Sequence, residues 1–289
     1  YKEFMMKVGF IGLGKMGSGI CVNLIRKGFD VVVYDINAAT VRKFVDMGAA
    51  SAASVKDLAR QVEVSVTCVP MPQDAAAVLL GPDGVLENLP VGAAHFDLST
   101  LDIDSVLTFE AEARKLGKHY MVIPMGKGPA VAAAGEVPLF AGGDRAIYDM
   151  FEDSLLKHMG KPTYMGDVKA GEAMKLIANL MGMSINAICS EGIKLAKRMG
   201  IPKDCFIASI TDSGAFSYQF MNTASGTFDE NFENPVFTVN LAFKDIRLGV
   251  EMAEKISQPV PVMTAARDQF KAAAEKYGNE NFTATFKVL

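Results

Sequence analysis

Three residues spaced four apart in an apolar segment have types suited to chemistry on a bound ligand: Gly171, Lys175 and Asn179. In a helix, residues four apart share one face, with a drift of about 40° per step. The glycine would leave room for a ligand, and the asparagine amide would donate to it or accept from it. Removal of an ammonium from water lowers its pKa toward neutrality, so Lys175 is a candidate general acid or base.

A lysine on an amphipathic helix commonly extends to solvent, and Lys175 viewed alone fits that description. Its neighbours Met174, Leu176 and Ile177 are apolar and favour burial. Spacing alone therefore leaves a catalytic lysine and a surface lysine both open.

A second constellation, near the amino end, is suited to binding. An apolar segment at 7–11 is followed at once by a GxGxxG motif, and a helix-like stretch at 18–27 follows the motif. This order is that of a Rossmann unit, in which the three glycines permit a tight turn, approach of a pyrophosphate and close helix packing. The helix amino end offers free N–H groups to the phosphates. The predicted dinucleotide-binding residues are Gly12, Leu13, Gly14, Lys15, Met16 and Gly17.

Asp35 directly follows a second apolar segment, at 29–34, and its carboxylate bears on which dinucleotide is bound. A carboxylate there accepts from the ribose 2′-OH and repels a 2′-phosphate. Residues 36–40 contain no arginine to receive that phosphate, so NAD is predicted over NADP. The alternative is that Asp35 is a cap or turn residue.

Strand and helix patterns alternate through the first half, which is typical of a parallel sheet covered by helices. Because ligands of such sheets lie beyond the carboxyl ends of the strands, the residues there are expected to border the nicotinamide half of the cofactor. These are Pro70, Met71, Ser99, Thr100 and the turn at 124–128. The expected strands are 7–11, 29–34, 49–53, 64–69, 94–98, 119–123 and 139–141, with helices at 18–27, 41–47, 55–61, 73–80 and 102–115.

The second half is predicted to be helical. Residues 170–199 have apolar positions at helical spacing and no proline, which predicts one helix of ~45 Å. Further helices are expected at 203–212, 216–220, 239–256 and 261–276. The predicted architecture is an α/β Rossmann domain with a doubly wound parallel sheet (1–165), joined through this long interdomain helix to an all-helical domain (166–289).

Composition limits the classes of partner. The chain has 289 residues, a net charge of −4 and half of its residues hydrophobic, so a nucleic-acid partner is not expected. Its four cysteines and three histidines are scattered without ligand spacing, so we expect no metal and no disulfide framework. We expect no membrane partner and a cytoplasmic location, because we find no uninterrupted apolar run of ~18 residues and no leader pattern. A native start at Met5 or Met6 is expected.

The motifs together resemble the β-hydroxyacid dehydrogenase family, which includes 3-hydroxyisobutyrate dehydrogenases and tartronate semialdehyde reductases. The matching segments, in family order, are GFIGLGKMG at 9–17, DLST at 97–100, the glycine-rich turn after Pro124, GxxxKxxxN at 171–179 and FKDI at 243–246. The resemblance implies a Rossmann domain, a long interdomain helix and a helical domain that assembles into homodimers or homotetramers.

The resemblance also implies roles for individual residues. These are the catalytic lysine at Lys175, the substrate-orienting amide at Asn179, strand-end contacts at Ser99 and Thr100, and a lysine reaching the cofactor at Lys244. A plain ion pair of Lys244 with Asp245 is the alternative for the last of them.

The turn at 124–128 departs from the commonest family pattern, Pro-Val-Ser-Gly-Gly. It reads Pro-Met-Gly-Lys-Gly, in which Gly126 and Gly128 are expected to keep open backbone and Lys127 adds a positive charge. The turn with a basic residue resembles that of sulfolactaldehyde reductases. Gly126, Lys127 and Gly128 are therefore predicted to bind the acid group of a substrate, together with Ser99 and Asn179. Lys127 would serve a carboxylate or phosphate equally well, and it could also be a solvated loop lysine.

The resulting hypothesis is an NAD-dependent oxidoreductase that interconverts a small anionic aldehyde and its hydroxyacid, with sulfolactaldehyde as the favoured substrate. The runner-up is a carboxylate-specific enzyme acting on tartronate semialdehyde or a 3-hydroxyisobutyrate-like acid. A non-catalytic dinucleotide-binding regulator is the alternative of another class. The lysine at 175 weighs against the regulator and against imine reduction.

Overall fold

The chain forms two compact units, one extending through Lys175 and one from Leu176 to Leu289. The computed structural model describes residues 6–289, so a start at Met5 lies outside the described residues. The predicted domain boundary after residue 165 lies just before helix α10 (Val168–Arg198), whereas the division between the units lies inside that helix.

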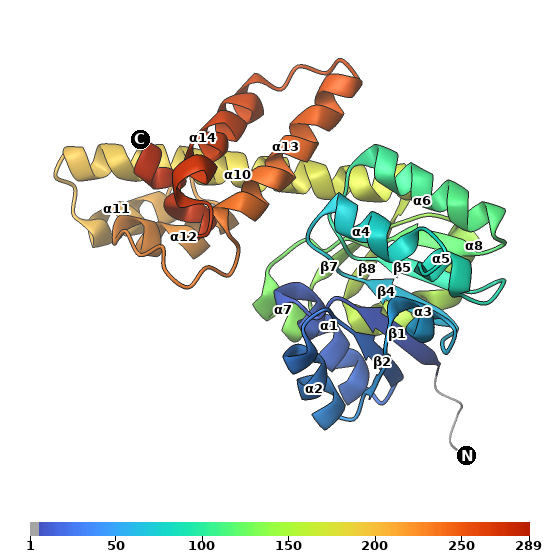
Figure 1. Ribbon diagram of the computed structural model, residues 1–289. Coiled ribbons are helices and arrows are strands. Elements are labelled where there is room, and N and C mark those ends of the chain that lie inside the picture. Colours follow the sequence, from blue (N-terminus) through green and yellow to red (C-terminus); the bar gives the residue numbers. More distant parts are fainter. Residues whose placement is uncertain (1–5) are drawn as a thin grey trace. The chain divides into compact units, whose positions relative to one another are not determined.

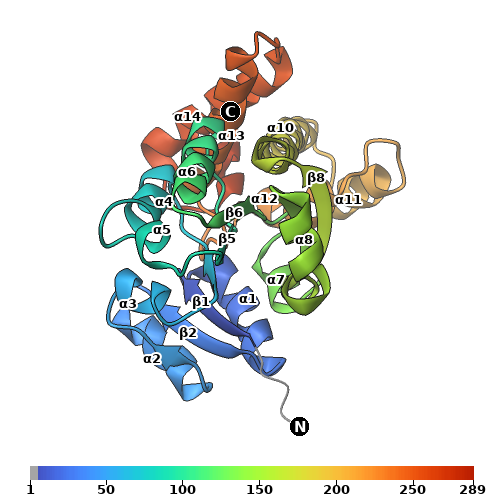
Figure 2. The same cartoon turned by 90° about the vertical axis from the view of Figure 1, so that its right-hand side faces the viewer.

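The first unit is built on one eight-stranded sheet of order β3-β2-β1-β4-β5-β6-β7-β8 (Figures 1 and 2). Its first six strands pair in parallel in the Rossmann order 3-2-1-4-5-6. Strand β7 pairs antiparallel with β6 and parallel with β8. The predicted α/β fold is thus confirmed, with two reversed strands at one edge. The bounds are β1 (Lys7–Ile11), β2 (Asp30–Tyr34), β3 (Ala50–Ser51), β4 (Val64–Thr67), β5 (Ala94–Asp97), β6 (His119–Val122), β7 (Pro138–Gly142) and β8 (Lys161–Gly166).

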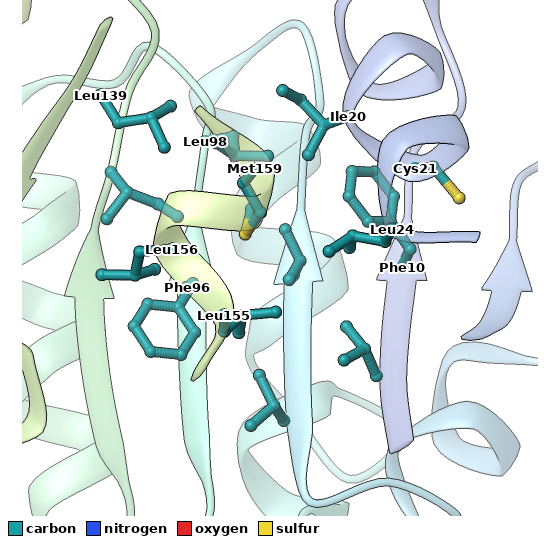
Figure 3. Close-up of a cluster of buried hydrophobic side chains, with 14 of the residues drawn as sticks. Phe10, Ile20, Cys21, Leu24, Phe96, Leu98, Leu139, Leu155, Leu156 and Met159 are labelled. Carbon is teal, nitrogen blue, oxygen red and sulfur yellow. The ribbon is translucent and has the colours of Figure 1, made fainter. Parts of the chain in front are cut away.

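Helices cover both faces of this sheet, so its central strands are buried on both sides. Neighbouring strand residues point to opposite faces: Phe10 belongs to one apolar cluster, shown in Figure 3, and Ile11 to the other. The covering helices are α1 (Lys15–Arg26), α2 (Ala38–Asp46), α3 (Val55–Ala59), α4 (Pro72–Leu79), α5 (Val85–Asn88), α6 (Ile103–Lys115), α7 (Pro129–Ala133), α8 (Arg145–Phe151), the π-helical turn Glu152–Leu156 and α9 (Lys157–Met159).

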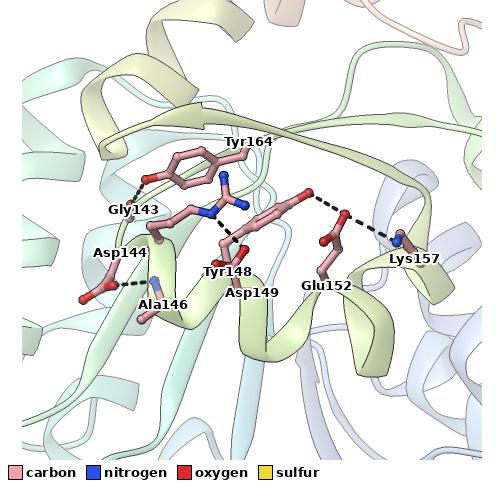
Figure 4. A network of polar contacts seen from close by, with 9 residues as sticks. Gly143, Asp144, Ala146, Tyr148, Asp149, Glu152, Lys157 and Tyr164 are labelled. Carbon is pink, nitrogen blue, oxygen red and sulfur yellow. Dashed lines mark hydrogen bonds and ion pairs between the residues drawn. The ribbon is translucent and has the colours of Figure 1, made fainter.

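Strand β8 is absent from the sequence prediction. Proline lacks a backbone donor and is tolerated on an edge strand, where Pro162 lies, but it masks the strand pattern. Polar contacts bind this edge to helix α8 (Figure 4). The Tyr164 hydroxyl donates to the Gly143 carbonyl at 2.9 Å, and the Arg145 guanidinium lies 4.9 Å from the centre of the Tyr164 ring.

The second unit is helical and has its own core. Its helices, besides the carboxyl part of α10, are α11 (Lys203–Thr211), α12 (Tyr218–Phe228), α13 (Val239–Lys255), α14 (Pro261–Tyr277) and a 3₁₀ segment at Phe282–Val288. Helix α12 is longer than expected; it begins where the Ser217 hydroxyl accepts from the Phe220 amide. The core includes Phe220, Phe270 and Phe286.

Helix α10 has 31 residues, as the long apolar pattern predicted. An 18-residue window within it reaches a mean hydropathy of 1.3, so by length and composition this helix could cross a membrane. The window is apolar on average although polar residues interrupt it, so it differs from the uninterrupted run considered in the sequence. The core helix of a soluble protein satisfies the same measure, and 44% of the window is buried within the structure.

Candidate functional site

The glycine motif lies between β1 and α1, and each glycine has a different environment. Gly12 has φ +91°, and a Cβ there would lie 2.2 Å from the Cys68 carbonyl oxygen. A Cβ at Gly17 would lie 2.2 Å from the Gly12 carbonyl oxygen, whereas one at Gly14 would meet nothing within 4 Å. Gly14 is also the N-cap of α1 and supplies no side-chain cap. The open approach to uncapped helix amides fits the pyrophosphate of a dinucleotide.

Asp35 lies directly beyond β2 and holds this loop. Its Oδ2 accepts from the Leu13 amide at 2.7 Å, and its Oδ1 accepts from the Asn37 amide at 2.8 Å. The turn role that we considered as the alternative is therefore present. Because an ionised carboxylate has about four acceptor positions, a ribose hydroxyl can still donate to it.

Ser99 holds together the ends of β4 and β5, which form the rim where we expected the nicotinamide half of the cofactor. This side chain is buried, and its Oγ accepts from the Val69 amide at 3.0 Å. The Ser99 amide donates to Asp97 Oδ1 at 2.9 Å. Pro70 is exposed, Met71 is the N-cap of α4, and Thr100 is half-buried. Ser99 thus fixes the strand ends where the nicotinamide was expected.

Beneath this rim lie acidic and phenolic groups that the sequence did not single out. The Tyr120 hydroxyl donates to Asp97 Oδ2 at 3.2 Å, and both residues are buried. Burial raises the pKa of Asp97, while hydrogen bonds from Ser99 oppose the rise. Burial and the nearby carboxylates of Asp97 and Glu172 raise the pKa of Tyr120 well above its ordinary value.

The turn at 124–128 is clamped to β7 on both sides of Met125. The Gly126 amide donates to the Pro138 carbonyl at 2.9 Å, and the Phe140 amide donates to the Pro124 carbonyl at 3.0 Å. The expectation of open backbone at Gly126 is therefore wrong, because its amide is bonded and a Cβ would lie 2.9 Å from the Phe140 ring. A Cβ at Gly128 would meet nothing within 4 Å, and Lys127 beside it is exposed.

Lys175 reaches this turn from α10. Its Nζ donates to the Met125 carbonyl at 2.6 Å, and the residue is half-buried. The structure thus brings the candidate proton donor to the segment predicted to bind the substrate acid. This juxtaposition is within the first unit.

Gly171 corrects the sequence interpretation. A Cβ there would lie 2.8 Å from Gly142 Cα and 2.8 Å from a methyl group of Val122. The space that we expected to hold a ligand is filled by the sheet. Gly171 instead lets α10 approach the end of β7 closely.

Asn179 and Lys244 meet in the second unit at a shared carboxylate. The Asn179 amide donates to Asp245 Oδ2 at 2.7 Å, and Lys244 Nζ lies 2.7 Å from Asp245 Oδ1. Lys244 and Asp245 are both buried. The ion pair that the sequence left open is present, and Asp245 binds two predicted functional residues.

Glu172 is a buried acidic residue beside Lys175 that sequence reasoning did not single out. Its side chain is fully buried in the first unit, and its Oε1 accepts from the Leu101 amide at 2.8 Å. The available signal was an acidic residue in an apolar helix three positions before a candidate catalytic lysine.

Two family models cover nearly the whole chain. The NAD binding domain of 6-phosphogluconate dehydrogenase matches residues 7–168. The NAD-binding domain of NADP-dependent 3-hydroxyisobutyrate dehydrogenase matches residues 170–289. The boundary between the models falls at the start of α10.

Individual relatives agree with these models. The chain is 29% identical to the 3-sulfolactaldehyde reductase of Escherichia coli, over 99% of this chain and 96% of that protein. It is also 29% identical to glyoxylate/succinic semialdehyde reductase 1 of Arabidopsis thaliana, over 98% of each chain. The crystal structure of a 3-hydroxyisobutyrate dehydrogenase from Salmonella typhimurium matches with a TM-score of 0.90 and 27% identity, over 98% of this chain and 100% of that one. The chain belongs to the 3-hydroxyisobutyrate dehydrogenase family and is an NAD-dependent hydroxyacid dehydrogenase or reductase, as its sequence motifs predicted.

Proposed function

We propose that the protein interconverts a small anionic aldehyde and its hydroxyacid, and that the acid group is a sulfonate, as in 3-sulfolactaldehyde. The observation that carries the proposal is the bond from Lys175 Nζ to the Met125 carbonyl. It joins a proton donor to a turn whose exposed Lys127 carries a positive charge two residues further on. The similarity to a 3-sulfolactaldehyde reductase supports the same substrate class.

Lys175 is the proposed proton donor in the reducing direction. NADH, when bound, would provide the hydride for the carbonyl carbon, and Lys175 Nζ would give a proton to the carbonyl oxygen, so that the aldehyde becomes an alcohol. In the oxidising direction Lys175 takes the hydroxyl proton. The acceptor at Met125 orients the ammonium without removing its proton, because a carbonyl only accepts.

The proposed binding roles follow the sequence prediction. Lys127, Gly128 and Ser99 are proposed to contact the acid group, and Asn179 is proposed to orient the substrate, whereas the Gly126 amide is already bonded to the Pro138 carbonyl. Pro70, Met71, Ser99 and Thr100 border the nicotinamide half of the cofactor, and Lys244 contributes to cofactor binding through the position that Asp245 gives it.

A carboxylate-bearing aldehyde is the second candidate substrate. The similarity to a glyoxylate/succinic semialdehyde reductase supports it, and a lysine binds either anion as a point charge.

The test is NADH oxidation against three-carbon aldehydes matched except for a sulfonate or a carboxylate, with NADPH as the cofactor control. We expect a sulfonate preference in the parent that Lys127→Ala reduces about tenfold, mainly through KM, because one charged contact is lost. A carboxylate preference in the parent would instead support the second candidate.

Lys175→Ala tests the proposed proton donor in the same assay. We expect this variant to bind NADH with parental affinity and to lose turnover by about a hundredfold or more. Undiminished turnover in Lys175→Ala would contradict the proposed proton transfer. Absence of turnover in the parent with every aldehyde would contradict the proposed substrate class.

A further inference from the structure

The first two turns of α10 are fixed to strand β7 and to the loops after β5 and β6 by three contacts of different kinds. Gly171 packs against the Gly142 backbone, the Glu172 carboxylate accepts from the Leu101 amide at 2.8 Å, and Lys175 donates to Met125 at 2.6 Å. All three are made within the first unit.

The Glu172 contact joins this helix to the loop that follows β5. That loop is held at both ends by buried carboxylates, since the Ser99 amide donates to Asp97 and the Leu101 amide donates to Glu172. The loop includes Ser99 and Thr100, the proposed rim of the nicotinamide site. Glu172 is the side chain through which α10 holds this rim.

Lys175 is three positions after Glu172, so the two side chains lie on neighbouring faces of one turn, about 4.5 Å apart along the helix axis. Whatever fixes the position of Glu172 therefore also fixes the rotation and depth of the turn that carries Lys175. Gly171 sets how closely the helix approaches the sheet but, having no side chain, forms no directional bond.

We propose that Glu172 is a positioning residue for proton transfer: its bond to the Leu101 amide sets where Lys175 Nζ lies relative to the 99–101 loop and the Met125 carbonyl. This inference rests on the proposed role of Lys175. It assigns Glu172 no contact with substrate or cofactor.

The test compares Glu172→Gln, Glu172→Asp and Glu172→Ala by steady-state kinetics. Gln keeps the side-chain length and an acceptor oxygen, so we expect its kcat to stay within about twofold of the parent and its pH profile to be unchanged. Asp is one methylene shorter and Ala has no acceptor, so both should lower kcat by about tenfold or more with little change in the KM for NADH, because displacement by about 1 Å can cost a hundredfold in rate. If Ala fails to fold, Asp against Gln decides.

Asn186→Ala is the matched control for loss of a buried hydrogen bond on the same helix. In the second unit, Asn186 Nδ2 donates to Thr285 Oγ1 at 3.1 Å, and both residues are buried. We expect this variant to lower Tm as Glu172→Ala does but to keep kcat within about twofold. Parental kcat in both Glu172→Asp and Glu172→Ala would overturn the proposal.

A crystal structure of Glu172→Asp separates this inference from the proposed substrate. We expect the 2.6 Å contact between Lys175 Nζ and the Met125 carbonyl oxygen to be lost or lengthened. An unaltered contact overturns the positioning role, whatever the turnover. If none of the aldehydes tested supports NADH oxidation by the parent, the proposed function fails. The distance from Lys175 Nζ to the Met125 carbonyl oxygen still decides the role of Glu172.

Discussion

At the scale of single residues, two glycines of one motif should respond in opposite ways to the same substitution. Gly12 is strained for any other residue, since its φ is +91° and a Cβ would lie 2.2 Å from a backbone oxygen. Gly14 has φ −67°, which alanine adopts freely, and open space where its Cβ would lie. The first glycine is needed for folding and the second is available for binding.

Gly12→Ala should therefore lower the free energy of unfolding by about 2 kcal/mol or more, because both strain and a clash are introduced. Gly14→Ala should keep the parental Tm and weaken NADH binding by about tenfold, because its methyl group would occupy the open approach that a pyrophosphate requires. Thermal unfolding and NADH fluorescence titration measure the two effects. Parental NADH affinity in a folded Gly14→Ala would contradict the placement of the cofactor.

The sequence predicted which residue types serve the glycine loop and the proton donor, because short-range spacing specifies them. It did not reveal Glu172, whose bond joins residues 71 positions apart. Nor did it show that Gly171 faces Gly142 rather than a ligand. Such contacts depend on how distant segments pack, which spacing along one helix does not encode.

At the scale of elements, β4 and β5 share a buried polar contact that should make stability depend on pH. His95 of β5 lies between two hydroxyls of β4, with Nδ1 2.7 Å from Ser65 Oγ and Nε2 3.0 Å from Thr67 Oγ1. Burial lowers the pKa of His95 to about 3. The folded strands thus hold the neutral imidazole.

Because the unfolded chain takes up a proton near pH 6.5 and the folded chain does not, stability from His95 is complete above that pH and is lost as pH falls toward 3. We expect a loss of about 1.4 kcal/mol per pH unit below about pH 6.5. Urea unfolding at pH 7 and pH 5 should show a smaller pH effect in His95→Gln than in the parent. An equal pH effect in His95→Gln and the parent would contradict this assignment.

Elements with a strong period were predicted closely, among them β1, β2, α6, α10 and α13. Those without one were missed: β8, which contains Pro162, and the short helical segments between residues 129 and 159. The reversed direction of β7 was also not foreseen, because strand polarity depends on how the chain connects and not on its hydrophobic pattern.

At the scale of the whole molecule, we propose that exposed apolar residues on α10 and directly after it form the interface of the homo-oligomer that the family resemblance implies. Five of them form a stripe within about 40° around the axis of α10 and are between 41% and 77% exposed. Four lie on the helix and the fifth, Met199, directly follows its end: Ile177, Met181, Ile188, Leu195 and Met199. Their intervals of four, seven, seven and four residues are symmetric about Ile188. Two antiparallel copies related by a two-fold axis would therefore pair like with like.

Ile188→Glu places a charge at the centre of this stripe and should shift the mass measured by light scattering toward the monomer. Val91→Glu is the control, because Val91 is 82% exposed in the first unit and outside the stripe. An unchanged mass in Ile188→Glu, or a monomeric parent, would show that the stripe is not an interface.

The contact between Gly171 and Gly142 also has a consequence for engineering this enzyme. With Gly142 Cα only 2.8 Å from where a Cβ of Gly171 would lie, the underside of the Lys175 turn is closed to redesign. Broader substrate acceptance must therefore come from the turn at 124–128 itself. A side chain at Gly128 of this turn would meet no neighbour within 4 Å. Directed evolution of new specificities should therefore accumulate changes around Lys127 and Gly128 while leaving the glycine pair untouched.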